Sequence, residues 1–454
     1  MRRSRLFCGK TVLFALSLIF TGVGIGAQEP VEGLNIMELT LNQAIDIALS
    51  DNPTVRIAEQ QIELKKISDT EMWQNLLPSA DFSGNVNYTV KAAVMKLNDM
   101  EFKMGQDNTS TWNGQFSVSL PVFAPTVYAT MNLTETDIEQ AVEQSRSSRL
   151  DLINQVTRAY YQLILAQDSY DVLEKSFLQS EKNFEVVNSM FQLGLVSEYD
   201  KISAEVQMRS LKPSVISTKN GVNLAKLQLK VLMGVTVDVE IGITDCLNNY
   251  ENEIYPEVLF ADNYSLENNT TIRQLMINEK MLNQSLHVQK MSFMPTLALV
   301  GSYSFQSLYN DNLKVFDYSW VQSSLVALSL SVPLFRAGNF TKLRSSKIQI
   351  SQLRENRLYT ERQLDMQARS FINNMKASSE QMASNREAIA QAQKGREIAE
   401  KRYEVGKGTI LELNNSEVSL TQAKLIYSQS IYDYLVAKSD LDKVLGKEYE
   451  ILGN

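Results

Sequence analysis

The 454-residue sequence has few of the residues from which most enzyme sites and disulfide frameworks are built. It contains one histidine, His287, and two cysteines, Cys8 and Cys246. His287 lies in a helical pattern without companion cysteines or clustered carboxylates, which argues against a metal site. The nine prolines and nineteen glycines form no linker. We therefore expect one extended architecture, with no metal, no cofactor and no catalytic residues.

Blocks of one charge are also missing from most of the chain. The net charge of −8 comes from 44 basic and 52 acidic residues that are dispersed, so nucleic acid is not an expected partner. At the N-terminus, four basic residues precede an apolar run at 12–20 and small residues up to Ala27. We interpret residues 1–27 as a secretory signal peptide. The mature chain would keep only Cys246 and could form no internal disulfide.

Long hydrophobic runs are absent beyond residue 27, so a membrane-spanning helix is not expected. Instead, apolar and polar residues alternate, as in the stretch from Phe82 to Val90. Such segments of about ten residues suit tilted strands that cross a bilayer, although soluble hairpins with one face on a core would alternate in the same way. The expected strand pairs are 79–90 with 112–122 and 296–307 with 319–333.

The chain is two copies of one unit. LLPSADF around Pro78 matches FMPTLAL around Pro295, and SLPVF around Pro121 matches SVPLF around Pro333. The interval from Pro78 to Pro121 is longer than that from Pro295 to Pro333, so the first copy has a longer loop between its strands. We divide the chain into a first repeat, an equatorial connector, a second repeat and a C-terminal tail, at 28–234, 235–263, 264–446 and 447–454.

A long helix follows each strand pair. No glycine or proline interrupts 126–193, and the corresponding segment at 339–405 contains only Gly395. Helices of this length span about 100 Å, and their narrow apolar stripes suit a coiled-coil wall. The return helices at 199–232 and 411–445 are shorter. The segments at 42–75 and 265–292 are expected to fill the remaining length.

Similar turns join each long helix to its return helix, in MFQLGLVSE and RYEVGKGTILE. Gly194 and Gly406 occupy equivalent positions in the two repeats, each on the third position after an aromatic residue. Both turns are a full helix away from the strands, so we expect them at the far tips of two hairpins. The tip turns comprise Gly194, Leu195, Val196 and Ser197 in the first repeat and Gly406, Lys407, Gly408 and Thr409 in the second.

Open strand edges are not tolerated in lipid, and the four strands of one chain cannot close a barrel. Several chains must therefore form one barrel together, and three chains would supply twelve strands. With the paired turns and the motifs LLPSADF, SLPVF and ALSDNP, the chain resembles the TolC-like outer-membrane efflux proteins, or outer membrane factors. The resemblance implies a mixed α and β fold. It also implies a homotrimer with a 12-stranded transmembrane β-barrel, four strands per chain, continued by a long periplasmic α-helical coiled-coil barrel.

The resemblance also implies a function. The protein would be the exit duct of a tripartite efflux system in the outer membrane of a Gram-negative-type cell, extending into the periplasm. It would passively conduct substrates delivered by an inner-membrane pump and a periplasmic adaptor (membrane fusion) protein. A type I protein secretion duct is an alternative with the same conduit. A stand-alone porin is a rival that needs no such long helices.

In that family the tip turns form the closed end of the tunnel and the adaptor-docking surface. Asp200 and Tyr403 match a carboxylate and an aromatic residue that bond between hairpins to hold the tip shut. Glu412 matches the first of two acidic ring positions, and the second falls on Asn415. Gly408 stands where a closure-bonding arginine is found in the best-known member of the family. The residues alone also permit a structural interpretation, in which Asp200 and Glu412 complement helix N-termini and Tyr403 packs within a hairpin.

Overall fold

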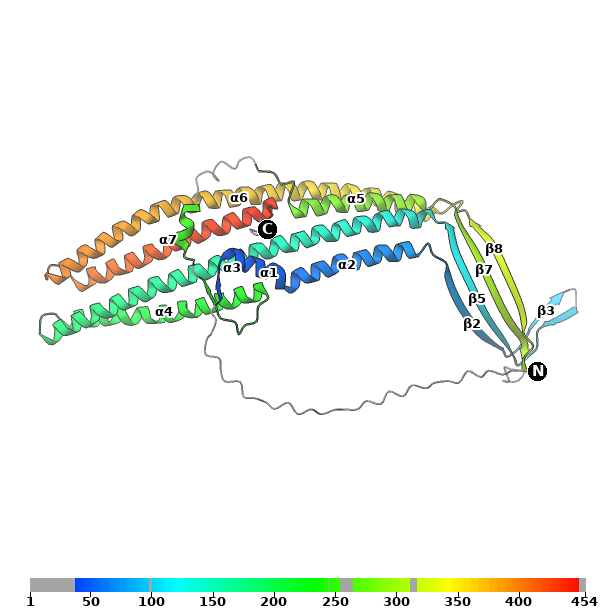
Figure 1. Ribbon diagram of the computed structural model, residues 1–454, viewed down its shortest axis with the longest axis horizontal. Helices are drawn as coiled ribbons and strands as arrows, with labels where there is room; N and C mark the ends of the chain where they lie inside the picture. The colour runs from blue at the N-terminus through cyan, green and yellow to red at the C-terminus, as the bar shows by residue number, and fades with distance from the viewer. Residues whose placement is uncertain (1–36, 98–99, 244, 254–263, 311–316, 449–454) are drawn as a thin grey trace, which may run out of the picture.

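The computed structural model describes residues 37–97, 100–243, 245–253, 264–310 and 317–448. The predicted signal peptide and most of the predicted C-terminal tail lie outside these residues. The molecule is elongated (Figure 1). Long helices run side by side along it, a four-stranded sheet occupies one end, and the α3–α4 (125–233) and α6–α7 (337–445) hairpins form the other.

Both repeats run from a helical segment through two long strands and a long helix to a return helix. The first helical segment, predicted as one helix at 42–75, is divided at Asn52 into two helices. The first repeat contains α1 (Leu41–Asp51), α2 (Pro53–Gln74), β2 (Ser79–Thr89), β5 (Thr109–Phe123), α3 (Pro125–Gln192) and α4 (Glu198–Met233). The second contains α5 (Thr270–Met291), β7 (Thr296–Asn310), β8 (Val321–Ser331), α6 (Ala337–Glu404) and α7 (Ile410–Leu445). Near the middle of the molecule, β1 (Met37–Leu39) pairs in parallel with β6 (Ile241–Ile243), which precedes the 3₁₀ helix η1 (Leu247–Glu253).

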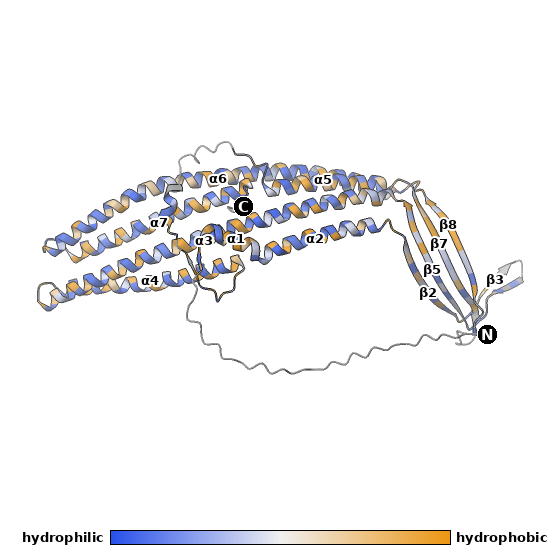
Figure 2. Cartoon of the chain, in the orientation of Figure 1, coloured by the Kyte–Doolittle hydropathy of each residue, from blue (hydrophilic) through white to orange (hydrophobic). Residues whose placement is uncertain are grey.

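The long helices α3 and α6 have 68 residues each and span about 100 Å. Their bounds differ from the predicted ones by one or two residues. Pro125 occupies the first helical position of α3, where its missing N–H costs nothing. Figure 2 shows hydrophilic and hydrophobic residues interspersed along both helices. None of the helices within the described ranges combines the length and hydropathy needed to cross a lipid bilayer.

Short helices stack end to end to match the long ones. The αL glycines Gly234 and Gly446 terminate α4 and α7. Asn52, the N-cap of α2, donates its side-chain amide to the Leu232 carbonyl at 2.7 Å. Asn269, the N-cap of α5, donates to the Val444 carbonyl at the same distance. Therefore α2 continues the path of α4 and α5 continues that of α7, as the lengths predicted.

The four long strands form one antiparallel sheet in the order β2-β5-β7-β8. Residues paired across neighbouring strands share a face, so the register defines two faces. The apolar face includes Phe82, Val86, Phe116, Val118, Leu299, Tyr303, Val326 and Leu328. The polar face includes Asp81, Ser83, Asn85, Gln115, Ser117, Ser302, Ser304 and Ser323.

The strand ends differ from the predicted bounds by up to three residues. Strand β5 begins at Thr109 instead of 112, directly after Asn108, which has a φ of 55°. Strand β8 runs over Val321–Ser331 instead of 319–333. A second antiparallel pair, β3 (Ala93–Leu97) and β4 (Met100–Met104), was not predicted. It follows β2 and precedes β5 along the chain and forms a sheet of its own. Ladder hydrogen bonds decide where a strand ends, and these depend on the partner strand rather than on alternation.

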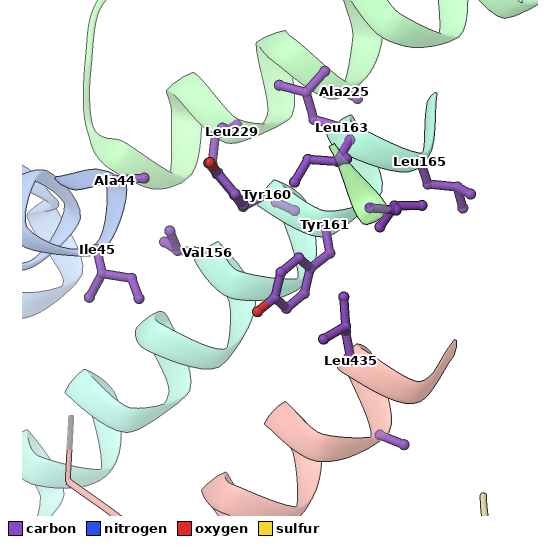
Figure 3. Packing of buried hydrophobic residues seen from close by; sticks show 14 of the residues in the cluster. Ala44, Ile45, Val156, Tyr160, Tyr161, Leu163, Leu165, Ala225, Leu229 and Leu435 are labelled. Carbon is purple, nitrogen blue, oxygen red and sulfur yellow. The ribbon is translucent and has the colours of Figure 1, made fainter. Parts of the chain in front are cut away.

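The largest hydrophobic core lies where α1, α3, α4 and α7 meet. Figure 3 shows Ile45 and Val156 beside Tyr160, while Leu435 of α7 faces Tyr161. The Tyr160 side chain is fully buried, and its hydroxyl donates to Asp245 at 2.6 Å. This core joins the two repeats near mid-length.

Candidate functional site at the hairpin tips

The α3–α4 turn closes through backbone bonds around Gly194. Gly194 has a φ of 73°, a left-handed conformation that glycine adopts without steric cost. Its N–H donates to the Phe191 carbonyl at 2.9 Å, and the Leu195 N–H donates to the Met190 carbonyl at 2.9 Å. This pattern satisfies carbonyls that a helix end leaves unpaired.

The α6–α7 turn repeats this geometry. Gly406 has a φ of 70° and donates its N–H to the Tyr403 carbonyl. Lys407 and Gly408 donate their N–H groups to the Arg402 carbonyl at 2.8 and 2.9 Å. A Cβ at Gly408 would lie 3.1 Å from the Arg402 Cβ. The stem of Arg402 therefore packs against Gly408.

A small apolar cluster joins the two hairpins at their tips. Its buried members are Val187 and Ala204 of the first hairpin and Ile410 and Leu413 of the second. Phe184, Val196, Ala399 and Tyr403 pack against them. The two tips thus form one surface, although each belongs to a different repeat and they lie far apart in the sequence.

Asp200 completes the N-terminal cap of α4. Its Oδ2 accepts hydrogen bonds from the Ser197 N–H at 3.1 Å and the Ser197 hydroxyl at 2.7 Å, and the Ser197 hydroxyl accepts from the Asp200 N–H at 3.1 Å. This reciprocal arrangement is a capping box. Within one chain, the helix-capping interpretation of Asp200 is therefore correct, and one side-chain oxygen remains for other contacts.

The Tyr403 hydroxyl interacts electrostatically with the carboxylate of Asp200. Burial, and next the negative charge of Asp200, raise the pKa of the Tyr403 hydroxyl. That hydroxyl is buried and has no hydrogen-bond partner among the described residues. An unpaired buried hydroxyl is costly, so the single chain leaves a donor at the tip that a neighbouring group could satisfy.

Glu412 is paired with a residue that the sequence analysis did not single out. Its Oε2 lies 3.6 Å from Nη1 of Arg402, whose Nη2 also donates to the Lys407 carbonyl at 3.2 Å. Thr409 caps α7 by accepting from the Glu412 N–H at 3.2 Å. The available signal for Arg402 was its position as the basic first residue of the RYEVG motif, in the last turn of α6. Asn415 is exposed.

A groove of about 310 Å³ runs along the second hairpin behind the tip. Small residues line much of it, together with the charged Arg402 and Glu412. The lining residues are Ala392, Gly395, Ile398, Ala399, Arg402, Glu412, Ser416 and Ser419. Within the described ranges, no group of three or more metal-binding side chains comes together.

The family model for "Outer membrane efflux protein" matches the chain over residues 44–235 and 263–447. The chain belongs to the outer membrane efflux protein family. The two matched segments correspond to the two structural repeats. The family assignment makes the chain an outer membrane efflux protein, and the solved channels below share its fold.

Individual relatives are distant in sequence. The outer membrane protein TolC of Escherichia coli (strain K12) is 21% identical over 427 residues, which cover 89% of this chain and 82% of TolC. The structure of the Campylobacter jejuni CmeC outer membrane channel matches with a TM-score of 0.68 at 16% identity, and the match covers 97% of this chain and 95% of the CmeC chain. The open-state Neisseria gonorrhoeae MtrE outer membrane channel has a TM-score of 0.69 at 18% identity, with 89% and 88% covered.

Proposed function

We propose that three copies of this chain assemble into a continuous duct across the outer membrane and periplasm. The main support for this proposal is the open sheet, in which β2 and β8 are both edge strands. Unpaired edges are not tolerated in lipid, and pairing β8 of each chain with β2 of the next removes every edge. Twelve strands would then enclose a lumen lined by the polar face.

The helices support the same assembly. Exposed apolar side chains remain on α2 and α4, including Leu64, Ile67, Ile202 and Leu224, each at least half exposed. Such positions would pack against neighbouring chains in a trimer. The 68-residue helices would carry the tunnel deep into the periplasm. In the proposed division of the chain, 28–234 and 264–446 form the repeats and 235–263 the equatorial connector.

The far tips are the proposed meeting point with an adaptor protein, and through it with an inner-membrane pump. The first tip turn and the residue before it present apolar side chains to solvent, since Leu195 and Leu193 are 70% and 75% exposed. A type I secretion system would use the same surface. The efflux assignment of the family favours a pump partner.

Detergent mass measurement and a designed crosslink test the trimer. In one chain β5 and β7 separate β2 from β8, which places them about 14 Å apart, too far for a disulfide. In a Cys246→Ser background, a variant with one cysteine on β2 and one on β8 should therefore crosslink only between chains. Non-reducing gels should then show species up to trimers. Cysteines placed on β2 and β7 provide the negative control. A monomeric mass with full β content would refute the proposal.

We further propose that Asp200 and Tyr403 help to hold the tips closed, while Glu412 favours cations at the mouth. The unpaired Tyr403 hydroxyl beside the Asp200 charge supports the first role. The contact between Arg402 and Glu412 weakens the expected cation preference, because the arginine offsets part of the Glu412 charge.

Planar-bilayer recordings test these roles. The Asp200→Ala/Tyr403→Phe variant should conduct more than the parent, because each lost tip bond is worth about 0.5–1.5 kcal/mol and recurs in every chain. Glu412→Gln should lower cation preference and Arg402→Gln should raise it. If all three variants keep the conductance and ion selectivity of the parent, the gate proposal is wrong, and these residues only cap helices or pack within the hairpins.

A further inference from the structure

The four strands of the main sheet contain one charged side chain. No lysine, arginine, histidine or glutamate occurs in β2, β5, β7 or β8, and Asp81 is their only aspartate. Its side chain is exposed. No salt bridge joins it to any residue in the described part of the chain. A lone charge in such a sheet has to be explained by the face on which it lies.

The register assigns Asp81 to the polar face. Asp81 pairs with Ser117 of β5, which pairs with Ser302 of β7, which pairs with Leu325 of β8. Its chain neighbour Phe82 belongs to the opposite, apolar face, where its ring lies 4.7 Å from that of Phe116. A membrane barrel turns its apolar face to lipid and its polar face to the lumen, so Asp81 faces the lumen.

The surroundings of Asp81 leave its charge unopposed. The next rows of the polar face hold Ser83, Gln115, Ser304 and Ser323 on one side, and Ser119, Val300 and Ala327 on the other. None of these side chains carries a compensating positive charge. Asp81 is the third residue of β2, so it lies near the end of the barrel that joins the helices.

We propose that Asp81 is a charge-selecting residue at the entrance of the barrel, where it favours cationic over anionic solutes as they leave the helical tunnel. The inference rests on the proposed trimeric duct, in which symmetry repeats the carboxylate three times around one level of the lumen. A ring of like charges raises the local concentration of counter-ions. This selection is separate from that at the tips, because Asp81 and Glu412 stand at opposite ends of the tunnel.

Reversal potentials of the full-length channel in a KCl gradient test the assignment, at low salt where screening is weak. Asp81→Asn should move the reversal potential toward zero, and Asp81→Lys should move it toward anion preference. Ser117→Asp combined with Asp81→Asn should restore the parent value, because Ser117 is the paired neighbour on the same face. Ser83→Asn, a neutral change on that face, is the matched control.

The outcomes separate the two proposals. A parent protein that forms no conducting channel would overturn the duct and this inference with it. Normal conductance with the parent reversal potential in Asp81→Asn and Asp81→Lys would overturn only the role of Asp81. A shift in Asp81→Asn that Ser117→Asp fails to reverse would also contradict it, since lumenal charge at that level is the proposed cause.

Discussion

At the scale of the residue, one glycine allows an aromatic ring to lie flat on the sheet. A Cβ built on Gly114 would lie 2.2 Å from the Phe305 ring. Phe305 in turn lies 6.4 Å from Phe116 and 5.5 Å from Trp320 between ring centroids. The ring thus fills the space above a residue that has no side chain, and the aromatic cluster links β5 and β7 with Trp320, the residue before β8.

Gly114→Ala should destabilise the barrel by about 1–3 kcal/mol, because the new methyl group forces Phe305 out of place. Gly301 is the matched control. It lies on the same face of neighbouring strand β7, and a Cβ there would meet nothing within 4 Å. The urea midpoint of the detergent-solubilised protein measures the difference. Equal midpoints for the two alanine variants would show that the ring does not depend on Gly114.

A second residue-scale feature is a carboxylate shared by two tyrosines in the central core. Tyr160 and Tyr250 donate their hydroxyls to the same Asp245 oxygen at 2.6 and 2.9 Å. Burial, with the added effect of Asp245, raises the pKa of Tyr160 above its ordinary value of 10.0. Burial likewise raises the pKa of Tyr250, and burial with a Glu251 hydrogen bond raises that of Tyr427 to about 12.

These shifts predict loss of stability in alkali. Each tyrosine has a higher pKa in the folded chain than in the unfolded one, so above pH 10 the folded chain binds more protons. Their contribution is fully present below pH 10 and should decrease as the pH rises through the range up to about 12. Urea midpoints measured across this range should fall less steeply for Tyr427→Phe than for the parent. Tyr359→Phe, at a 66% exposed position, is the control.

At the scale of the element, asparagine caps join short helices into longer paths. Asn52 and Asn269 each accept from the first N–H groups of their helix and donate to the last carbonyls of another. The second joint has an additional tie, because Arg146 of α3 donates to the carbonyls of Asn268 and Gly446. A Cβ at Gly446 would lie 2.0 Å from the Asn268 carbonyl oxygen, so this joint requires glycine.

The two functions of Asn269 can be separated by substitution. Asn269→Asp keeps the capping oxygen but removes the donor to Val444, whereas Asn269→Ala removes both. We expect Asn269→Ala to cost about 1–2 kcal/mol for the cap plus the lost carbonyl partner, and Asn269→Asp to cost less. Helical circular dichroism in urea gives the midpoints. An aspartate variant as unstable as the alanine variant would assign the stability to the joint rather than to the cap.

At the scale of the whole molecule, the sheet decides how the chain meets its surroundings. The apolar face is solvent-exposed in the single chain, with Phe116 at 52% and Val326 at 79%. The same residues become lipid-facing in the proposed barrel. The polar face, which holds Ser117 and Ser302, would line the lumen.

Val118 and Ser117 are adjacent residues that the register places on opposite faces. Arginine at Val118 should impair membrane assembly by about 2–4 kcal/mol near mid-bilayer, while arginine at Ser117 should be tolerated and change conductance. The amount of heat-resistant protein recovered from the outer membrane measures the first effect. Equal losses for both variants would contradict the assignment of the faces.

Much of the fold follows from local patterns in the sequence. Period-two alternation predicted all four long strands, and the absence of glycine and proline predicted the uninterrupted α3. The repeated glycine turns predicted hairpin tips, because a positive φ at the end of a helix is a property of the residue itself. The β3–β4 pair was missed, since such short strands are decided by their pairing rather than by their own pattern.

The sequence by itself thus determined the repeat, the periodicities and the turns, each of which depends on neighbours within one helix or strand. Only the tertiary structure decided the partners of individual side chains at the tips. In that structure the Tyr403 hydroxyl is buried without a partner, and Arg402 of α6 lies beside Glu412 of α7. The burial of Tyr403 depends on how two hairpins from different repeats pack together, whereas the Arg402–Glu412 pair depends on how the two helices of one hairpin meet at their turn.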